Sequence, residues 1–387
     1  MTAGRATCGW TTPSALGLLL LLAACGTAPP APDRPGAVPT APAPQPAATA
    51  PATTGGAVLQ QPRSRWVPVP WSELPGLDDD ALAEAWPAWL RSCARPGPDW
   101  GAACAQVRRL ASADTAQQRA WMLSALQPYR VEDAQGASQG LLTAYYEPVL
   151  EASRQRRTGF EVPLYRPPAA LRTRKPWYTR EEMDTLPEAR AALAGHELLW
   201  VSDAVDALVL QIQGSGRLRV TEADGRQRLV RLAFAATNDQ PYRSVGRWLL
   251  DQGAVREASW PTIRAWLTHN PQRVQELLWS NPRVVFFREE ALPEGEAPGP
   301  RGAQGVPLTA GRSIAVDPQS IPYGAPVWLD SPGPTRALRR LVLAQDTGSA
   351  IVGAVRADFF AGAGFAAGEE AGRLRQALRL WVLWPRP

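Results

Sequence analysis

The stretches Val306-Pro-Leu-Thr-Ala-Gly-Arg-Ser-Ile-Ala-Val-Asp317 and Gln345-Asp-Thr-Gly-Ser-Ala-Ile-Val-Gly-Ala-Val-Arg-Ala-Asp358 decide the fold of this chain. Short β-like runs lie in or beside them, and an aspartate ends or follows each run: Asp317, Asp346 or Asp358. Glycine and proline residues separate these runs, as in the turn sequence Pro322-Tyr-Gly324. Short apolar runs divided by such turn residues predict a compact all-β unit.

The three aspartates have a functional and a structural interpretation. A carboxyl group beside a tight turn with apolar neighbours can act as an acid, because burial raises its pKa. Asp-Pro and Asp-Thr-Gly are also common turn sequences, since the Asp side chain accepts a hydrogen bond from the backbone two residues on. The residues alone leave both interpretations open for Asp317, Asp346 and Asp358.

Polar side chains also gather in four segments that precede this unit. They are Gly140-Leu-Leu-Thr-Ala-Tyr-Tyr-Glu-Pro148, Leu208-Val-Leu-Gln-Ile-Gln-Gly-Ser-Gly-Arg217, Asn238-Asp-Gln-Pro-Tyr-Arg-Ser-Val-Gly-Arg247 and Asn281-Pro-Arg-Val-Val-Phe-Phe-Arg288. The first predicts a strand in which Tyr145 and Tyr146 point to opposite faces, so only one of them can line a cleft. A core tyrosine with a satisfied hydroxyl is the structural alternative.

The second segment predicts a strand whose amide face is free to bind sugar hydroxyls. In an extended chain Leu208, Leu210 and Ile212 share one face, and Gln211 and Gln213 share the other. Glycines beside Ser215 allow close approach of a ligand to the backbone. No helix start follows Gly-Ser-Gly, which excludes a phosphate-binding loop. The candidate substrate-binding residues from these segments are Tyr145, Tyr146, Glu147, Gln211, Gln213, Gly214, Ser215, Tyr242 and Arg243.

Together these motifs, in this order from Gln139 to Trp384, resemble the membrane-bound lytic murein transglycosylase A family. The three-aspartate pattern resembles the 3D domain of that family, which is a double-psi β-barrel. The resemblance implies a peptidoglycan-cleaving enzyme whose one catalytic aspartate corresponds to Asp358. It implies a mainly β fold, in which a smaller mixed α/β domain is inserted into a barrel split in sequence, with a groove between them and helical segments at the N-terminus.

A lytic transglycosylase needs fewer catalytic groups than a hydrolase. The O6 hydroxyl of N-acetylmuramic acid attacks its own C1 and forms a 1,6-anhydro ring, and such intramolecular reactions reach effective molarities on the order of 10⁵ M or more. One carboxyl then serves as general acid and base, so Asp358 is the expected catalytic residue, with Asp346 and Asp317 in supporting roles. Burial beside Phe359 and Phe360 would raise its pKa.

Two other functions remain open at this point. A glycoside hydrolase would use Asp358 with a second carboxylate, Asp346 or Asp317. A non-catalytic wall-binding module would use the same barrel without cleavage. The cleavage products separate these three possibilities: anhydro ends, reducing ends or no cleavage.

The N-terminus predicts a lipid anchor. Met1 to Ala24 has the form of an export signal, with Leu22-Ala-Ala-Cys25 as a lipoprotein cleavage box, and Gly26 resembles an outer-membrane sorting signal. The Ala-, Pro- and Thr-rich residues 25–62 predict an extended tether. We therefore expect a periplasmic enzyme bound to the outer membrane.

Of the four cysteines, Cys8 leaves with the signal and Cys25 is acylated. Cys93 and Cys104 remain in an oxidising compartment, where we expect a disulfide. No histidine accompanies them, so a metal site is not expected, and no motif suggests a cofactor.

The composition adds a weak indication of the partner. The net charge of +5 and pI near 9.3 suit an anionic cell-wall polymer, and no basic block suggests nucleic acid. Peptidoglycan strands are the expected partner, and proteins of cell-wall synthesis are a further candidate. The 16 tryptophans divide between core packing and sugar stacking.

We expect five parts along the chain. They are the signal (1–24), the tether (25–62), N-terminal helices with the first part of the barrel (63–150), the inserted substrate-binding domain (151–286) and the 3D domain (287–387). Helices are predicted within Trp71–Trp100, from Ala116 after an Asp114 cap, and over Glu369–Leu378. The chain is expected to leave the barrel near Pro163 and to return in Asn281–Arg288.

Overall fold

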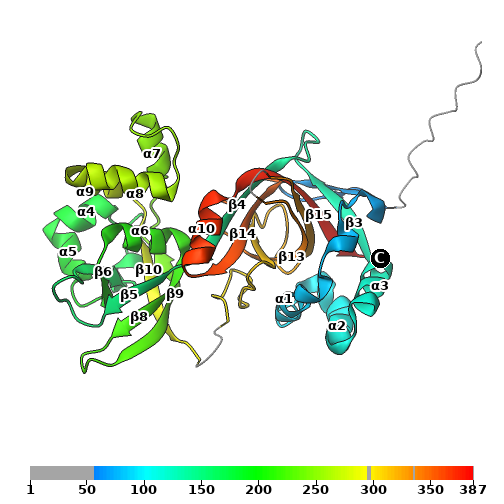
Figure 1. Cartoon of the computed structure of the whole chain (residues 1–387), viewed down its shortest axis with the longest axis horizontal. Coiled ribbons are helices and arrows are strands. Elements are labelled where there is room, and N and C mark those ends of the chain that lie inside the picture. The colour runs from blue at the N-terminus through cyan, green and yellow to red at the C-terminus, as the bar shows by residue number, and fades with distance from the viewer. Residues whose placement is uncertain (1–55, 294–297, 334–335, 387) are drawn as a thin grey trace, which may run out of the picture. The chain divides into compact units, whose positions relative to one another are not determined.

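The computed structural model of the protein describes residues 56–293, 298–333 and 336–386 (Figure 1). Its larger sheet closes on itself, because the strand at one end of the order pairs back onto a strand in the middle. The strands of this ring are β15 (Arg375–Pro385), β12 (Pro326–Ser331), β13 (Leu338–Asp346), β11 (Ser313–Val316), β14 (Arg356–Ala363) and β4 (Gly140–Glu147). The mainly β barrel, split in sequence, is confirmed.

Three strands extend the ring beyond β15. They are β3 (Leu126–Glu132), β2 (Arg65–Pro68) and β1 (Leu59–Gln60). The tether predicted to reach residue 62 therefore ends earlier, because Leu59 and Gln60 pair with Trp66 and Arg65. The signal and Cys25 lie outside the described residues.

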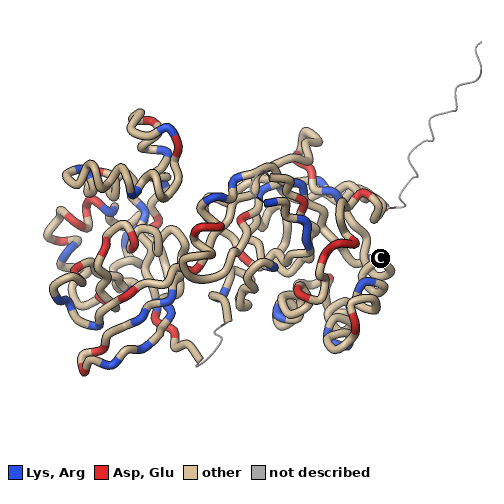
Figure 2. The backbone as a smooth tube through the Cα atoms, in the orientation of Figure 1, with Lys and Arg blue, Asp and Glu red and all other residues tan. Residues whose placement is uncertain are grey.

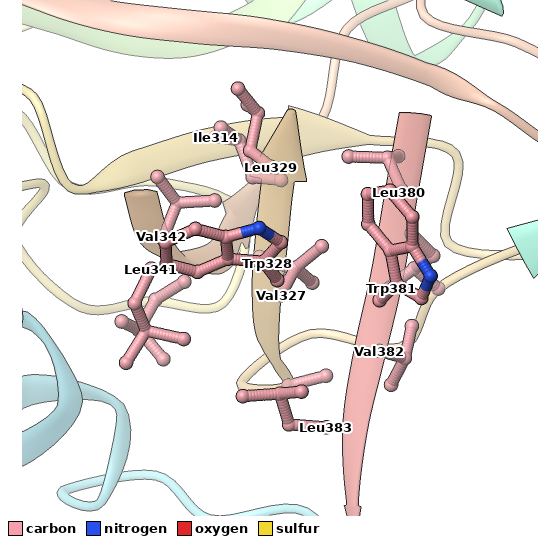
Figure 3. Close-up of a cluster of buried hydrophobic side chains, with 14 of the residues drawn as sticks. Ile314, Val327, Trp328, Leu329, Leu341, Val342, Leu380, Trp381, Val382 and Leu383 are labelled. Carbon is pink, nitrogen blue, oxygen red and sulfur yellow. The ribbon is translucent and has the colours of Figure 1, made fainter. Parts of the chain in front are cut away.

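Large apolar side chains from β11, β12, β13 and β15 form a buried cluster in the barrel part of the molecule (Figure 3). Trp328 and Trp381, paired across β12 and β15, are both completely or almost completely buried. Apolar residues occur on both faces of these strands, because the N-terminal helices and the extra strands cover the outside. Burial of this area is the main term that stabilises the barrel.

A second, six-stranded sheet forms the centre of the inserted part. Its strands, in spatial order, are β10 (Val285–Ala291), β9 (Gln227–Thr237), β8 (Ser215–Thr221), β5 (Val149–Ser153), β7 (Glu197–Val201) and β6 (Val162–Tyr165). The chain thus leaves the barrel at Pro148, directly after β4, rather than near Pro163. It also stays in this sheet through Ala291, so Asn281–Arg288 does not yet return it to the barrel.

Six helices accompany this sheet. They are α4 (Arg180–Thr185), α5 (Pro187–Leu193), α6 (Ala204–Gln213), α7 (Val245–Asp251), α8 (Trp260–His269) and α9 (Val274–Trp279). The strand predicted from Leu208 is wrong, because residues up to Gln213 form α6. Leu210 packs into the core of the sheet while Leu208 packs against the helices α7, α8 and α9. Gly214, in the left-handed conformation, ends the helix.

The N-terminal helices form a compact unit against the barrel. They are α1 (Trp86–Ser92), α2 (Gly101–Arg109) and α3 (Thr115–Ala125), preceded by three 3₁₀ turns within residues 71–84 in place of a longer helix. Asp114 makes the predicted cap, reciprocated by Gln117. A disulfide joins Cys93 to Cys104. Trp86, Trp89, Trp100 and Trp121 pack together with ring centroids 5.3–6.5 Å apart.

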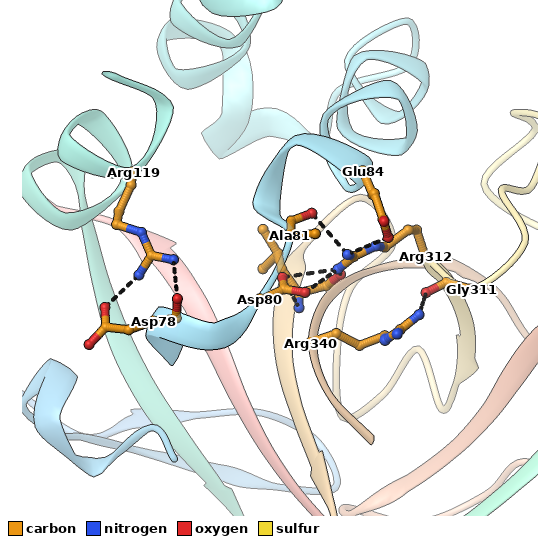
Figure 4. Close-up of polar contacts among 9 residues, drawn as sticks. Asp78, Asp80, Ala81, Glu84, Arg119, Gly311, Arg312 and Arg340 are labelled. Atoms are coloured by element: carbon orange, nitrogen blue, oxygen red, sulfur yellow. Dashed lines mark hydrogen bonds and ion pairs between the residues drawn. The ribbon is translucent and has the colours of Figure 1, made fainter. Parts of the chain in front are cut away.

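An almost completely buried arginine attaches this unit to the barrel (Figure 4). Arg312 Nη1 lies 2.9 Å from both carboxylate oxygens of Asp80, and Nη2 lies 2.9 Å from Glu84 Oε2. The same guanidinium donates to the backbone oxygens of Ala81 and Leu341. Such a charged network specifies one docking position for the N-terminal turns.

The last helix is shifted from the predicted position. Glycine-364 precedes α10 (Phe365–Arg373), and β15 already begins at Arg375. Gln376, Leu378 and Leu380 are buried while the residues between them are more exposed, and this alternation of burial is typical of a strand. None of the helices in the described part of the chain is long and apolar enough to cross a membrane.

Candidate active site

Two of the three aspartates lie on either side of one barrel residue. Ala315 on β11 pairs with Asp346 on β13 and with Asp358 on β14. Asp358 in turn pairs with Thr143 on β4. Residues directly opposite each other on neighbouring strands project from the same face of a sheet. The fold therefore gathers the two carboxyl groups and a hydroxyl on one face.

Asp358 is a half-buried carboxyl with one oxygen committed to the protein. Thr143 Oγ1 donates a short hydrogen bond to Asp358 Oδ1, and Arg356 Nη2 donates to Thr143 Oγ1 at 2.7 Å. Within the described residues, Oδ2 has no hydrogen-bond partner. Burial raises the pKa of Asp358, and the Thr143 hydrogen bond and the Arg356 charge only partly oppose this.

Asp346 has both oxygens occupied. Tyr145 Oη donates to Oδ2 at 2.8 Å, and the backbone N–H of Ala303 donates to Oδ1 at 2.9 Å. Burial raises the pKa of Asp346 and the negative charge of Asp358 adds to this, while these hydrogen bonds and the Thr347 backbone lower it. An acid must release its proton to a substrate, so Asp346 is the less suitable of the two.

Two aromatic side chains, Tyr145 and Phe360, shield this face of the barrel from water. Phe360 is buried, and its ring centroid lies 5.3 Å from that of Tyr145 on the neighbouring strand. Burial raises the pKa of Tyr145 well above its ordinary value. Strand alternation places Phe360 on the same face as Asp358, whereas Phe359 belongs to the barrel core. Of the two phenylalanines expected to desolvate Asp358, only Phe360 thus shares its face.

A cavity of about 480 Å³ lies beside these groups. It is lined by residues of both sheets: Tyr145, Gln211, Ile212, Gln213, Gly214, Ser215, Ala233, Phe234, Arg283, Val285, Arg288, Pro300, Arg301, Gly302, Ala303, Leu308, Asp346, Thr347, Gly348 and Ser349. Asp358 lies next to this lining, across Ala315 from Asp346. The cavity therefore brings Asp346 and Tyr145 together with the segment Gln211–Ser215.

The two glutamines reach the cavity from a helix rather than from a strand. Gln211 Oε1 accepts a hydrogen bond from Arg180 Nη2 at 2.7 Å. Gln213 Oε1 accepts one from the backbone N–H of Tyr146 at 3.0 Å. Their amide oxygens are thus held inside the protein, which orients both side chains at the end of α6.

Glu147 and Asp317 have structural partners. Glu147 has no exposed surface, and its carboxylate is paired with Arg231 at 2.5 Å and Arg217 at 2.8 Å. It cannot contact a substrate in this position, which corrects its assignment as a substrate-binding residue. Asp317 is buried, pairs with Arg63 at 3.0 Å and accepts hydrogen bonds from the backbone of its own turn and of Gly353.

The remaining predicted residues lie away from this cavity lining. The Tyr146 ring covers Gly368 of α10, where an added Cβ would lie only 2.8 Å from the ring. Tyr242 is half-buried, and burial raises its pKa. The backbone N–H of the exposed Arg243 donates to Asn281 Oδ1 at 3.2 Å. A substrate longer than the cavity would be needed for these residues to act on it.

Several residues of the site were not predicted. Thr143 could have been found, because it lies two residues before Tyr145 and so shares its face. Phe234 exposes 48% of its surface at the cavity, whereas no tryptophan belongs to this lining. Arg283, Arg288 and Arg301 gave no signal, since isolated arginines are common on protein surfaces. In the described ranges, no three His, Cys, Asp or Glu side chains are grouped as metal ligands would be.

Comparison with known proteins shows the same two modules. Residues 141–288 match the MltA specific insert domain, and residues 312–384 match the 3D domain. The membrane-bound lytic murein transglycosylase A of Escherichia coli K12 is 34% identical over 287 residues, which cover 72% of this chain and 73% of the relative. Its counterpart in Vibrio cholerae is 32% identical over 262 residues, which cover 64% of this chain and 67% of that protein.

Solved structures agree with these matches. The crystal structure of MltA from Neisseria gonorrhoeae has a TM-score of 0.70 at 29% identity, covering 86% of this chain and 97% of its own. E. coli MltA with bound chitohexaose gives 0.65 at 26% identity, with 89% and 98% covered. The lytic transglycosylase LtgG of Burkholderia pseudomallei gives 0.58 at 44% identity, with 87% and 99% covered.

Proposed function

This chain belongs to the membrane-bound lytic murein transglycosylase A family and is a lytic transglycosylase of peptidoglycan, and we propose that Asp358 is its only general acid and base. The observation that carries the proposal is the contrast between the two carboxyl groups of the site. Burial raises the pKa of both carboxyl groups, but Asp358 has an oxygen without a partner in the described residues, while both oxygens of Asp346 are occupied.

In the proposed reaction Asp358 donates one proton to the substrate and takes one proton back from it. Asp358 donates the proton of Oδ2 to the oxygen of the β-1,4 bond between N-acetylmuramic acid and N-acetylglucosamine, and the bond from C1 to that oxygen breaks. The O6 hydroxyl of the same muramic residue then attacks C1 and forms the anhydro ring, while the carboxylate takes the O6 proton. No water is consumed, and Asp358 ends in its starting state.

The surrounding residues support this cycle in different ways. Because Thr143 donates to Oδ1, the proton of the neutral acid belongs on Oδ2. Arg356 fixes the Thr143 hydroxyl in that orientation. Tyr145 and Phe360 keep water away from the carboxyl, which favours its neutral form.

Digestion of purified sacculi, with mass spectrometry of the product ends, tests the proposal. Asp358→Asn keeps the shape of the side chain but cannot carry the proton, so anhydro product should fall by about 10²–10⁴-fold or more. Binding to sacculi should persist. Asp346→Asn and Asp317→Asn should retain measurable turnover. Reducing ends from the wild type would favour the two-carboxylate hydrolase, and an active Asp358→Asn with an inactive Asp346→Asn would reassign the acid.

We also propose that the protein is anchored to the outer membrane through acylated Cys25. The Leu22-Ala-Ala-Cys25 box and the word "membrane-bound" in the names of its relatives support this. Cys25→Ala should remove the lipid mass from the N-terminal peptide and release the protein from the outer-membrane fraction. Unchanged fractionation, with no lipid on the wild-type peptide, would contradict the anchor.

A further inference from the structure

The cavity beside Asp358 is lined by more basic than acidic side chains. Three arginines line it, Arg283, Arg288 and Arg301, against the single carboxyl group of Asp346. Elsewhere along the described backbone basic and acidic residues are interspersed (Figure 2). The lining of this cavity therefore carries an excess of positive charge.

Two of these arginines have no carboxylate partner within 4.0 Å among the described residues. Arg283 Nη1 donates to the backbone oxygen of Gln240 at 3.1 Å, and Arg301 Nη1 donates to that of Gly305 at 2.5 Å. Arg288, by contrast, is paired with Glu290 at 2.8 Å. Each of the two guanidiniums has five N–H donors, so most donors of Arg283 and Arg301 remain for a ligand.

Burial makes the Arg283 charge costly without an anion. Arg283 is half-buried, and burial lowers its pKa, while the negative charge of Asp239 opposes this only in part. A carboxylate that binds there would restore the favourable interactions that the guanidinium loses with water. The fork of an arginine matches the two oxygens of a carboxylate, which makes it better suited than lysine to such recognition.

We propose that Arg283 and Arg301 bind carboxylates that the peptidoglycan strand carries on its muramic acid residues. The inference rests on the proposed function and assigns its substrate class as the anionic strand rather than the sugar backbone alone. Phe234 offers a flat apolar surface to a sugar ring, which every glycan has. The arginines add a preference that a neutral glycan cannot satisfy.

The carboxylate on a muramic acid residue can come from two sources. Its lactyl group carries a free carboxylate when the strand has no peptides, and the stem peptide carries its own carboxylates when one is attached. Three strands therefore separate the sources: peptide-bearing strands, strands freed of peptide by an amidase, and the freed strands with every carboxylate converted to an amide by carbodiimide coupling. The sugar backbone is the same in all three.

The experiment compares kcat/KM on these strands for the wild type, Arg283→Gln and Arg301→Gln. A hydrogen-bonded charge pair contributes about ten- to a hundredfold in binding, so each variant should lose about that factor on carboxylate-bearing strands. Neither variant should lose activity on the amidated strands. A loss confined to peptide-bearing strands would assign the stem peptide, a loss confined to the freed strands would assign the lactyl group, and a loss on both anionic strands would assign both carboxylates.

Arg247→Gln is the matched control for net charge. Arg247 is exposed on α7, pairs with Asp251 at 2.8 Å and does not belong to the cavity lining, so its removal should change none of the three rates. Arg301→Gln guards against misfolding, because among the described residues the Arg301 side chain donates only to the backbone oxygen of nearby Gly305. Thermal melting confirms that each variant folds.

Equal loss on all three strands, or no loss on any, would overturn the inference. The failure of the proposed function would look different, since the wild type would then yield no anhydro product from any strand. In that case binding of the three strands to Asp358→Asn still tests carboxylate recognition. Preference of that variant for the anionic strands, abolished by adding Arg283→Gln, would support it.

Discussion

Asp358 and Asp346 are the same chemical group, and hydrogen bonding distinguishes their environments. Three donors stabilise Asp346, from Thr347, Tyr145 and Ala303, whereas Asp358 has the Thr143 hydroxyl and a nearby cation. The sequence predicted both as candidates, because each follows a β-like run. It could not rank them, since the Ala303 and Thr143 donors come from segments 43 and 215 residues away.

The raised pKa of Asp358 predicts how activity depends on pH. The acid must be protonated to donate, so kcat/KM should fall as pH rises through the folded-state pKa of Asp358, which lies above the ordinary carboxyl range. Thr143→Val removes a hydrogen bond that lowers this pKa, so its descending limb should shift to higher pH. A pH–rate profile on sacculi, recorded for the wild type and for Thr143→Val, measures the descending limb of each protein. An unshifted limb would mean that another group titrates.

The same shift makes Asp358 a source of instability. The folded state binds its proton more tightly than the unfolded state, so ionisation above the folded-state pKa destabilises the protein, and this cost vanishes below the ordinary carboxyl pKa. Asp358→Asn should therefore melt higher than the wild type at neutral pH, with the difference shrinking in acid. Melting temperatures measured across pH test this. Asp317→Asn is the opposite control, because it breaks the Arg63 pair and should melt lower.

Among the elements, α6 is the one whose sequence pattern led to a wrong prediction, a strand instead of a helix. Ala207, Leu208, Val209 and Leu210 are all buried, so the run is apolar all round and carries no clear helical period. A strand and a buried helix look alike under these conditions. Burial between the sheet core and the helices α7 to α9 selects the helix, and that contact involves residues far away in sequence. Gln211 and Gln213 both line the cavity, although in the helix they no longer share one face as they would in a strand.

Ser92, at the end of α1, is hydrogen-bonded to residues that lie next to the cavity lining. Gln345 Nε2 donates to Ser92 Oγ at 2.7 Å, and Ser92 Oγ donates to Gln304 Oε1 at 3.1 Å. Gln345 directly precedes Asp346, and Gln304 directly follows Ala303, the backbone partner of Asp346. Ser92 is in turn adjacent to Cys93 of the disulfide. The N-terminal helices thus position Asp346 from outside the barrel.

Removing this support should affect both stability and turnover. The double change Cys93→Ser and Cys104→Ser should cost about 2–3 kcal/mol, as expected for a short loop. Ser92→Ala, with the disulfide intact, should cost about 1–3 kcal/mol, because Gln345 and Gln304 lose a buried partner. Urea unfolding gives the stabilities, and anhydro product gives kcat and KM. We expect kcat to fall with little change in KM, whereas unchanged kcat in stable protein would show that the helices only stabilise the fold.

For the whole molecule, β4 is the strand that joins the site to the inserted sheet. Thr143 bonds to Asp358, Tyr145 bonds to Asp346, and Glu147 pairs with Arg217 on β8 and Arg231 on β9. The order of the motifs along the chain predicted the two modules. The sequence did not predict this joint, because an isolated Glu after two tyrosines has the same local pattern whether it binds a sugar or two arginines.

Glu147→Gln tests whether this joint is structural. The change leaves the buried Arg231 without its closest anion, and breaking such a pair typically costs about 3–5 kcal/mol. Substrate cannot reach a completely buried carboxylate, so KM measured well below the melting temperature should stay near the wild-type value. Glu151→Gln is the matched control: its pair with Arg219 is exposed at both ends, and its loss should change stability by less than about 1 kcal/mol. A raised KM in a Glu147→Gln protein of unchanged stability would instead restore Glu147 as a substrate contact and would require the inserted sheet to separate from β4 during catalysis.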